Sequence, residues 1–223
     1  MKVVRITEQV ADEWVKNKHY SRRPSIFRAG FALVIDGKIE GVCIYGQPSP
    51  PIQKYAFIDR EFRLYELARL VIQTKRKNAA SFLIGNSLKQ LETPCAVVSY
   101  ADSNYNHCGY VYQATNWLYT GGTKSHDHTY IVDGVKMHPM TIRDKFNVTN
   151  LKAWAKENGI KTEKPKVKHR YFYVCGSKTQ KKKMRKQLKY DIIEEYPKVE
   201  PDRYDDGDDI DGDDGDDDDD DEY

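Results

Sequence analysis

The chain has 223 residues, of which 31% are charged, and a formal net charge of +2, a length that suits one sizeable domain or one domain with an appendage. No apolar run reaches the roughly 18 residues that a membrane span requires, and the first residues, MKVVRITEQV, lack the apolar stretch of a signal peptide. We therefore expect a cytoplasmic protein that does not bind membranes.

The charge is divided unevenly along the chain. Residues 200–223 contain sixteen acidic side chains and one arginine, a formal charge of −15, whereas residues 1–199 hold the other 35 basic and 18 acidic side chains, a formal charge of +17. A body this basic is typical of proteins that bind polyanions such as nucleic acids, although a basic surface also serves solubility alone. The acidic segment has almost no apolar side chains, so we expect a disordered tail.

The first half of the chain contains patterns for helices, a hairpin and a strand. Ile6, Val10 and Trp14 recur at helical spacing and predict a first helix that ends near KNKHYSRRPS. Two apolar runs on either side of Asp36-Gly37 predict a tight hairpin. A proline-rich loop, PSPPIQ, then leads to a strand, RLYELARLVIQ, which passes through the polar segment TKRKNAAS into a helix, SFLIGNSLKQL.

The second half begins with an apolar run, CAVVSYAD, that predicts a short buried strand. GYVYQATNWLY has aromatic residues at helical steps and predicts a helix, and Asp133-Gly134 in TYIVDGVKMHP predicts a second hairpin. NLKAWAKENGI and VKHRYFYVC predict a short helix and a strand, and the segment KTQKKKMRKQLK is basic on nearly every face.

The order helix, hairpin, strand, basic loop, helix, strand, helix, hairpin is similar to the order found in GNAT acyltransferases. The resemblance implies an α/β fold of the layered α+β kind, with a mixed, mostly antiparallel central sheet flanked by helices. We expect residues 1–147 to form this catalytic domain and residues 148–199 a basic C-terminal extension with a short helix and a strand. The disordered acidic tail would then occupy residues 200–223.

The GNAT resemblance also implies an acyl cofactor, acetyl-CoA or a related donor. In that fold the pyrophosphate of the cofactor binds the exposed N–H groups at the start of a helix, where the helix dipole favours an anion. The corresponding segment here departs from the usual glycine-rich loop. With the strand residue Arg69, the residues that the resemblance assigns to the cofactor are Lys75, Arg76, Asn78, Ala79, Ala80 and Ser81. The alternative is a basic loop that merely caps a core helix.

A narrower resemblance covers roughly residues 10 to 146 and depends on HYSRRP, ELARL, YADSNYNHCGYVYQATNW and the Thr-Gly-Gly that follows. In these segments the chain resembles the Mom family of phage proteins, which chemically modify adenine in DNA. The resemblance implies that His19, Tyr20, Asp102 and Tyr112 are catalytic, and that iron is a further candidate cofactor, with His19 and Asp102 as metal ligands. Glu66 in ELARL could orient the neighbouring arginine.

The residues themselves are compatible with these assignments. Asp102 follows the apolar run of its strand, at the end where α/β sheets form binding crevices, and a carboxylate there can accept a proton from an exocyclic amine or hold a metal. Tyr112 lies where GNAT enzymes often place a tyrosine that protonates the departing thiolate.

Each of these residues also has a structural alternative. His19 could simply cap the first helix, with Tyr20 beside it, and Asp102 could cap the next helix or belong to a turn. Tyr112 belongs to an aromatic stretch that would ordinarily pack in the core. Further histidines, His107, His126 and His128, are weak candidates for metal ligands because their spacing matches no strong motif.

An enzyme that acts on adenine in a duplex must extrude the base from the stack or use single strands, and aromatic side chains receive the base. We expect Tyr20 and Trp117 to receive it. Arg22, Arg23 and Arg28 lie next in sequence to the His-Tyr pair, and we expect them to bind DNA phosphates.

The leading hypothesis is therefore a DNA adenine-modifying transferase of the GNAT acyltransferase type, made by a phage and acting in the host cytoplasm. It would convert adenine N6 in DNA to an acetamido (carbamoylmethyl) adduct and so protect the DNA from restriction endonucleases. DNA is the expected partner, and the oligomeric state stays open, a dimer included. The alternatives are an ordinary GNAT N-acetyltransferase that acts on a protein or small amine, and a non-enzymatic anti-restriction protein whose acidic tail mimics DNA.

Overall fold

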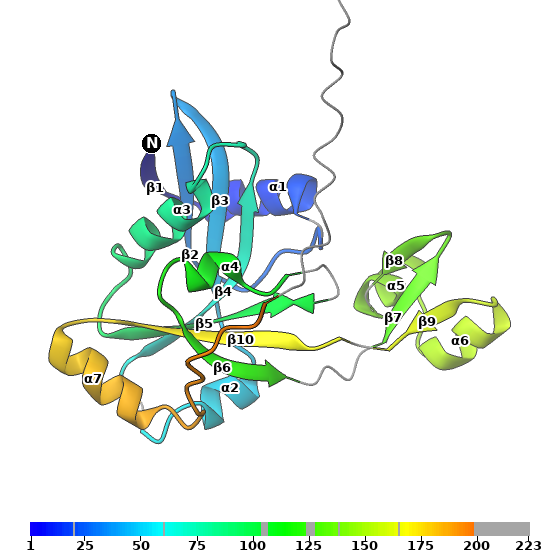
Figure 1. The fold of residues 1–223 in the computed structure, drawn as a ribbon. Coiled ribbons are helices and arrows are strands. Elements are labelled where there is room, and N and C mark those ends of the chain that lie inside the picture. The colour runs from blue at the N-terminus through cyan, green and yellow to red at the C-terminus, as the bar shows by residue number, and fades with distance from the viewer. Residues whose placement is uncertain are drawn as a thin grey trace, which may run out of the picture.

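The computed structural model describes residues 1–19, 21–59, 61–103, 107–123, 128–137, 139–164 and 166–198 (Figure 1). The strands of its main sheet are β1 (Lys2–Ile6), β2 (Phe27–Ile35), β3 (Lys38–Gly46), β4 (Arg63–Ile72), β5 (Cys95–Asp102), β6 (Leu118–Thr123) and β10 (Lys168–Cys175). They pair in the order β1-β2-β3-β4-β5-β10-β6. The β4–β5 pair is parallel and the other pairs are antiparallel.

Helices cover both faces of this sheet. They are α1 (Glu8–Lys18), α2 (Pro50–Tyr55), α3 (Ala79–Leu88), α4 (Tyr110–Gln113) and α7 (Lys178–Gln187). Because side chains alternate along a strand, Tyr45 of β3 packs with Leu83 of α3 on one face, whereas Ile44 packs with Val15 of α1 on the other. The mixed, mostly antiparallel sheet flanked by helices is thus confirmed. No helix in the described ranges combines the length and apolarity that crossing a bilayer would require.

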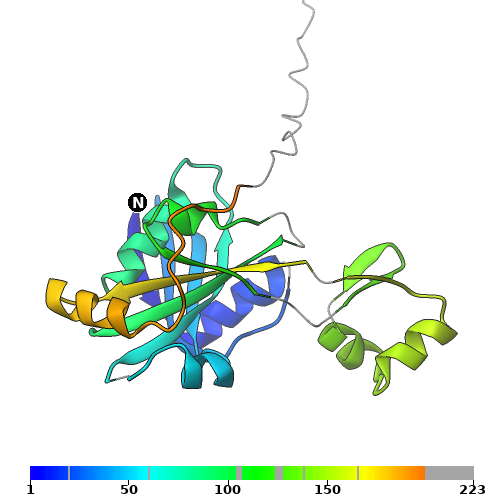
Figure 2. The ribbon, with the colours of Figure 1, turned by 60° about the horizontal axis from the view of Figure 1, so that its bottom comes forward.

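A smaller unit is inserted between β6 and β10. It contains β7 (Thr129–Val132), β8 (Val135–Met137), α5 (Pro139–Phe146), α6 (Leu151–Glu157) and β9 (Lys161–Glu163), and its strands pair in the order β8-β7-β9. The unit has a core of its own, which includes Tyr130, Ile142 and Leu151. Figures 1 and 2 show it beside the main body, at the side where β6 ends and β10 begins. We call residues 128–164 the inserted unit.

The expected domain boundary at residue 147 is wrong, because it cuts through the inserted unit. Residues 148–199 do not form an extension either: β10 lies inside the main sheet, between β5 and β6. Its side chains Tyr171 and Phe172 are fully buried, one on each face of the sheet. The C-terminal part of the described chain therefore completes the main core.

Both Asp-Gly hairpins are confirmed, with left-handed backbone at Asp36, Gly37, Asp133 and Gly134. Three local predictions were wrong. Ile6 was assigned to the first helix, but it is the last residue of β1, which pairs with β2. Thr7 then caps the helix that follows. The proline-rich loop contains the short helix α2, because proline is favoured at the first helical position. The helix expected in GYVYQATNWLY is a single turn, since the backbone becomes left-handed at Asn116 (φ 59°) and the chain enters β6.

Candidate active site

The central strands β4 and β5 separate halfway along their length. Their parallel pairing runs from Arg63 opposite Cys95 to Glu66 opposite Val98. Beyond this point β4 continues along β3 and β5 along β10, and the two arrowheads diverge in Figure 1. The residues that follow on each strand no longer have the neighbouring strand as a hydrogen-bond partner, so other groups must satisfy their backbone atoms.

Ser99 and Tyr112 occupy the point of separation, on the face covered by α3 and α4. Ser99 Oγ lies 2.8 Å from the Leu67 carbonyl oxygen of β4 and 2.8 Å from the Tyr112 hydroxyl oxygen. A hydroxyl carries one proton, so Ser99 donates to the carbonyl and accepts from Tyr112. Burial raises the pKa of Tyr112, and the Glu66 carboxylate adds to this effect. Tyr112 is therefore a protonated phenol that already donates a hydrogen bond.

The position of Tyr112 depends on close packing of α4 against β10. Gly109 precedes α4 with a φ of 87°, a conformation that favours glycine. A Cβ atom there would lie 2.5 Å from Cε2 of Tyr171. The Tyr112 and Tyr171 rings are in contact, with centroids 5.1 Å apart. The glycine thus allows the approach that brings the Tyr112 hydroxyl to Ser99.

Charged residues gather on the opposite face of the same strands. Asp102, at the end of β5, pairs with Lys168 of β10, whose Nζ lies 3.2 Å from its Oδ2. Glu66 of β4 is half-buried, and burial raises the pKa of its carboxyl, while the charges of Arg69 and Lys168 act in the opposite direction. Asp102 and Glu66 therefore share Lys168 as a neighbouring cation.

His19 ends α1 and is 7% exposed. Its Nδ1 accepts a hydrogen bond from the Ser21 backbone N–H at 3.0 Å and lies 2.8 Å from Ser21 Oγ. Burial lowers the pKa of His19 to about 4, and the charges of Arg69 and His107 contribute to this decrease. The ring is thus neutral near pH 7, and because Nδ1 is an acceptor, Nε2 carries the proton. In this state His19 is a hydrogen-bond donor and not a base.

The four residues predicted to be catalytic are only partly brought together. His19 and Asp102 belong to the charged face. The charge of Arg69 acts on both His19 and Glu66, and Lys168 acts on Glu66 and pairs with Asp102. Tyr112 lies on the other face, at the point of strand separation. Tyr20 lies outside the described residues.

Arg69, which was assigned to the cofactor, holds the segment after α1 against the sheet. Its Nε donates to the Arg23 carbonyl oxygen at 2.9 Å and its Nη1 to the Ala68 carbonyl oxygen at 2.7 Å. Ala68 is the point where the pairing of β3 with β4 shifts by one residue. Arg69 therefore fixes the end of α1, and with it His19, relative to β4.

The loop assigned to the cofactor joins β4 to α3, as expected. Asn78 has a left-handed backbone (φ 61°), and its side chain makes no capping hydrogen bond to α3. The Ser81 hydroxyl instead donates to the Asn78 carbonyl oxygen at 3.1 Å. The Asn78 side chain thus leaves the Ala80 and Ser81 N–H groups of the first turn uncapped, whereas the Ala79 N–H donates to the Arg76 carbonyl oxygen at 3.3 Å. The exposed Lys75 and Arg76 add positive charge. The Ala80 and Ser81 N–H groups and the two cations fit the pyrophosphate of acetyl-CoA, whereas Ala79 is buried and its N–H is already bonded.

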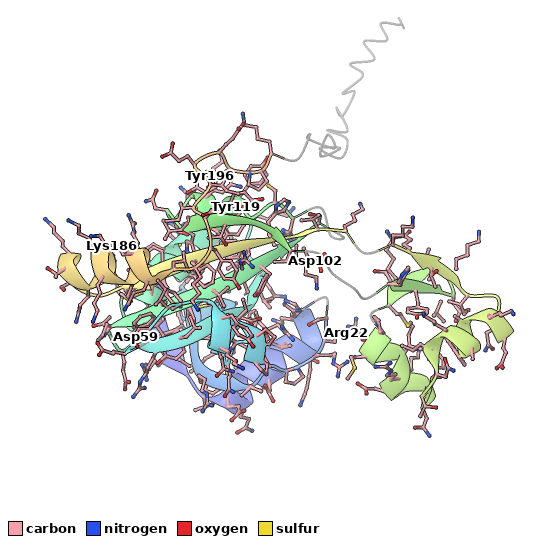
Figure 3. The ribbon with its side chains drawn as sticks, turned by 90° about the horizontal axis from the view of Figure 1, so that it is seen from below. Arg22, Asp59, Asp102, Tyr119, Lys186 and Tyr196 are labelled. Atoms are coloured by element: carbon pink, nitrogen blue, oxygen red, sulfur yellow. The ribbon has the colours of Figure 1, made fainter. Side chains whose placement is uncertain are left out.

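The three arginines predicted to bind DNA differ in their surroundings. Arg22 is exposed and lies on the side of the main body nearest the inserted unit (Figure 3). Arg28 is also exposed and donates to Gln47. Arg23 instead pairs with Asp144 of α5, its Nη2 lying 3.0 Å from Oδ2, and so connects the two parts of the molecule.

The prediction that Trp117 receives a base is wrong. Its side chain is fully buried between the rings of Tyr112 and Tyr173, with centroid distances of 5.1 and 5.6 Å. The left-handed Asn116 before it turns the chain from α4 into β6 and directs the indole into the core. Trp117 therefore supports Tyr112 by packing.

Iron finds no support among the residues that the structure describes. Among them, no group of three or more histidine, cysteine, aspartate or glutamate side chains is close enough together to hold a metal ion. The two expected ligands are also engaged otherwise: Asp102 pairs with Lys168, and His19 Nδ1 accepts from Ser21. His126 lies outside the described residues.

Two site residues were missed by the sequence reasoning. Ser99 could have been noticed, because it is a polar residue within the buried run CAVVSYAD and therefore needs a hydrogen-bond partner. Lys168 gave no such signal, because its place beside Asp102 depends on the pairing of β10 with β5.

Comparisons with known proteins found both similar solved structures and a matching family model. The solved structures that resemble the chain include an N-acetyltransferase from Staphylococcus aureus Mu50 (TM-score 0.43, 13% identity, 78% of this chain and 97% of that chain covered). They also include a GNAT-family acetyltransferase from Bacillus cereus ATCC 10987 (TM-score 0.42, 11% identity, 79% and 98% covered) and the aminoglycoside 6'-N-acetyltransferase from Enterococcus faecium (TM-score 0.42, 9% identity, 78% and 97% covered). Similarity at this level says nothing about substrate.

A comparison by sequence is more informative. No curated protein matches the chain. The model of the Mom protein family, in contrast, matches residues 1–198, which include both faces of the candidate site, the inserted unit and α7. The chain belongs to the Mom protein family.

Proposed function

We propose that the chain is a transferase that modifies the N6 amine of adenine in DNA with a small acyl-derived group. The observation that carries the proposal is the family match over residues 1–198. Tyr112, at the point of strand separation, and Asp102, at the end of β5 on the opposite face, are the groups to which the proposal assigns proton transfer. The basic body, with a formal charge of +17 over residues 1–199, supports DNA as the partner. Such a modification would protect the DNA from restriction endonucleases.

Acetyl-CoA or a related thioester is the proposed donor, and it would supply an activated acyl group. The first turn of α3 and the basic residues before it would hold its pyrophosphate. The Tyr112 hydroxyl, kept protonated by burial, would give a proton to the thiolate that leaves. Ser99 holds that hydroxyl at the point where β4 and β5 part.

The charged face would handle the amine of adenine. Its N6 must lose a proton when it forms a new bond, and the carboxylates of Asp102 and Glu66 on this face could accept that proton. His19 Nε2–H would donate a hydrogen bond to a ring nitrogen of the base, since the neutral ring keeps this donor near pH 7. Lys168 would hold the Asp102 carboxylate in place during the proton transfer.

The test is to express the chain in bacteria, digest plasmid DNA to nucleosides and weigh the deoxyadenosines by mass spectrometry. A heavier deoxyadenosine is expected, and its mass distinguishes an acetyl group from a carbamoylmethyl group. Asp102→Asn is the matched variant: it keeps the size of the side chain and removes the base, so its deoxyadenosine should have the ordinary mass. Ordinary deoxyadenosine from the wild-type chain as well would overturn the proposal.

A further inference from the structure

Helix α7 carries a concentration of positive charge that the candidate site does not use. Its ten residues include six cations and no acidic side chain. Lys183 is paired with Glu61, its Nζ lying 2.9 Å from Oε2. The other five cations line a shared hollow on the surface, and they are Lys178, Lys181, Lys182, Arg185 and Lys186.

The fold prevents this helix from turning its charges elsewhere. Met184 is 2% exposed and packs with Phe172 and Ile52, so one side of α7 is anchored to the sheet and α2. Ser177 and Gln180 form a capping box that fixes the first turn. The positive side chains therefore stay on the outward side.

The charges on α7 also repel one another. Lys178, Lys182 and Lys186 are four residues apart and form a single ridge along the helix, where like charges destabilise it. This ridge is about 12 Å long, at 1.5 Å per residue. Duplex DNA presents a phosphate charge about every 1.7 Å of its axis, so a ridge of this length faces several phosphates at once.

The distance between α7 and the candidate site suits a duplex that touches both. Strand β10 connects them, because Lys168 at its beginning pairs with Asp102 and Cys175 at its end leads into α7. Its seven residue steps of about 3.3 Å each correspond to roughly 23 Å. Figure 3 shows the labelled Lys186 and Asp102 well apart, with α7 and the inserted unit on opposite sides of Asp102.

We propose that the ridge of Lys178, Lys182 and Lys186 binds the phosphate backbone of duplex DNA about seven base pairs from the adenine being modified, since each base pair rises about 3.4 Å. The proposal rests on the proposed function, which supplies DNA as the substrate. The ridge contributes affinity and orientation and takes no part in the chemistry.

The test compares the full chain with two triple variants. In the first, Lys178, Lys182 and Lys186 are replaced by Gln, which has a similar helix propensity. The matched control replaces three exposed lysines outside α7, Lys2, Lys38 and Lys89, by Gln. Affinity is measured over a salt series for two duplexes that carry one adenine. The long duplex extends about 15 base pairs beyond the adenine on each side and exceeds the span of about seven base pairs, whereas the short duplex extends about 3 base pairs and does not reach it.

The α7 variant should bind the long duplex more weakly, and its salt dependence should fall by about 0.9 for each phosphate that the ridge no longer neutralises. Each neutralised phosphate contributes about eightfold at 0.1 M relative to 1 M salt, so a variant that neutralises two fewer phosphates should bind about 60-fold more weakly. The control variant should bind the long duplex with the affinity and the salt dependence of the wild type. On the short duplex both variants should modify adenine with the kcat of the wild type.

The two proposals fail in different ways. Equal affinity and equal salt dependence of the α7 and control variants on the long duplex would overturn the proposal for α7, whether or not adenine is modified. A wild-type chain that leaves adenine unmodified would overturn the proposed function, and the binding measurement would still decide whether α7 holds DNA.

Discussion

Lowering the pH from 7 to 5 should destabilise the folded chain through His19. The pKa of His19 is about 4 in the folded chain, whereas an unfolded histidine has a pKa of about 6.5. Between these values the unfolded chain binds a proton that the folded chain does not bind. The free energy of unfolding therefore falls as the pH decreases through this window, and the decrease is complete near pH 4.

The expected decrease in the free energy of unfolding depends on how much of the range between the two pKa values the experiment crosses. From pH 6.5 to pH 5 it spans 1.5 units at about 1.36 kcal/mol each, or about 2 kcal/mol. Solvent screens part of the charge, so we expect about 1–2 kcal/mol. The measurement is urea unfolding of the wild type and of His19→Gln at both pH values. The variant lacks the titrating group, so the stability of the wild type relative to the variant should decrease by this amount at pH 5.

A second histidine with a lowered pKa does not disturb this comparison. Burial also lowers the pKa of His169, but that residue is present in both the wild type and His19→Gln, so its contribution cancels from the comparison. An NMR titration of the His19 ring gives its midpoint directly. A stability difference between the wild type and His19→Gln that is the same at pH 7 and pH 5, or a His19 midpoint near 6.5, would refute the reasoning.

Three further predictions concern activity, donor and tail. Tyr112→Phe should fold normally and leave adenine unmodified, because the ring still packs but no longer has a proton to give; full modification by this variant would contradict the role of the hydroxyl. Acetyl-CoA should raise the Tm, since a ligand that binds the folded state stabilises it, and the absence of a shift at millimolar concentrations would indicate a different donor. Deletion of residues 200–223 should tighten non-specific DNA binding, most at low salt, because a tethered segment of charge −15 competes with phosphates for the basic surface. Equal affinity of the full and shortened chains at every salt concentration would show instead that the tail is only a solvated segment.

Local signals in the sequence predicted the parts of the fold that depend on neighbouring residues. The two Asp-Gly turns are hairpins because the backbone conformation they need is set by those two residues alone. The apolar runs around Leu67 and Val98 form buried strands for a similarly local reason: β-branched and apolar side chains suit a sheet that is covered on both faces.

The parts that could not be predicted depend on contacts between distant segments. The pairing of Asp102 with Lys168 requires β10 to lie beside β5. The residue pattern within each strand does not indicate which other strand will pair with it. Trp117 was misplaced for a related reason. Its spacing from Tyr112 suits a helix, but the single left-handed residue Asn116 ends that helix early and turns the indole into the core.

The place of β10 also sets the order in which the chain can fold during its synthesis. The edge strand β6 pairs with β10, which the ribosome makes only after the whole inserted unit has emerged. Until then β6 has no strand to join, and β5 exposes the edge that will later accept β10. The inserted unit, with a core made from one continuous segment, can fold during this interval. A nascent chain halted before Lys168 would therefore present an open sheet edge to chaperones or to other chains.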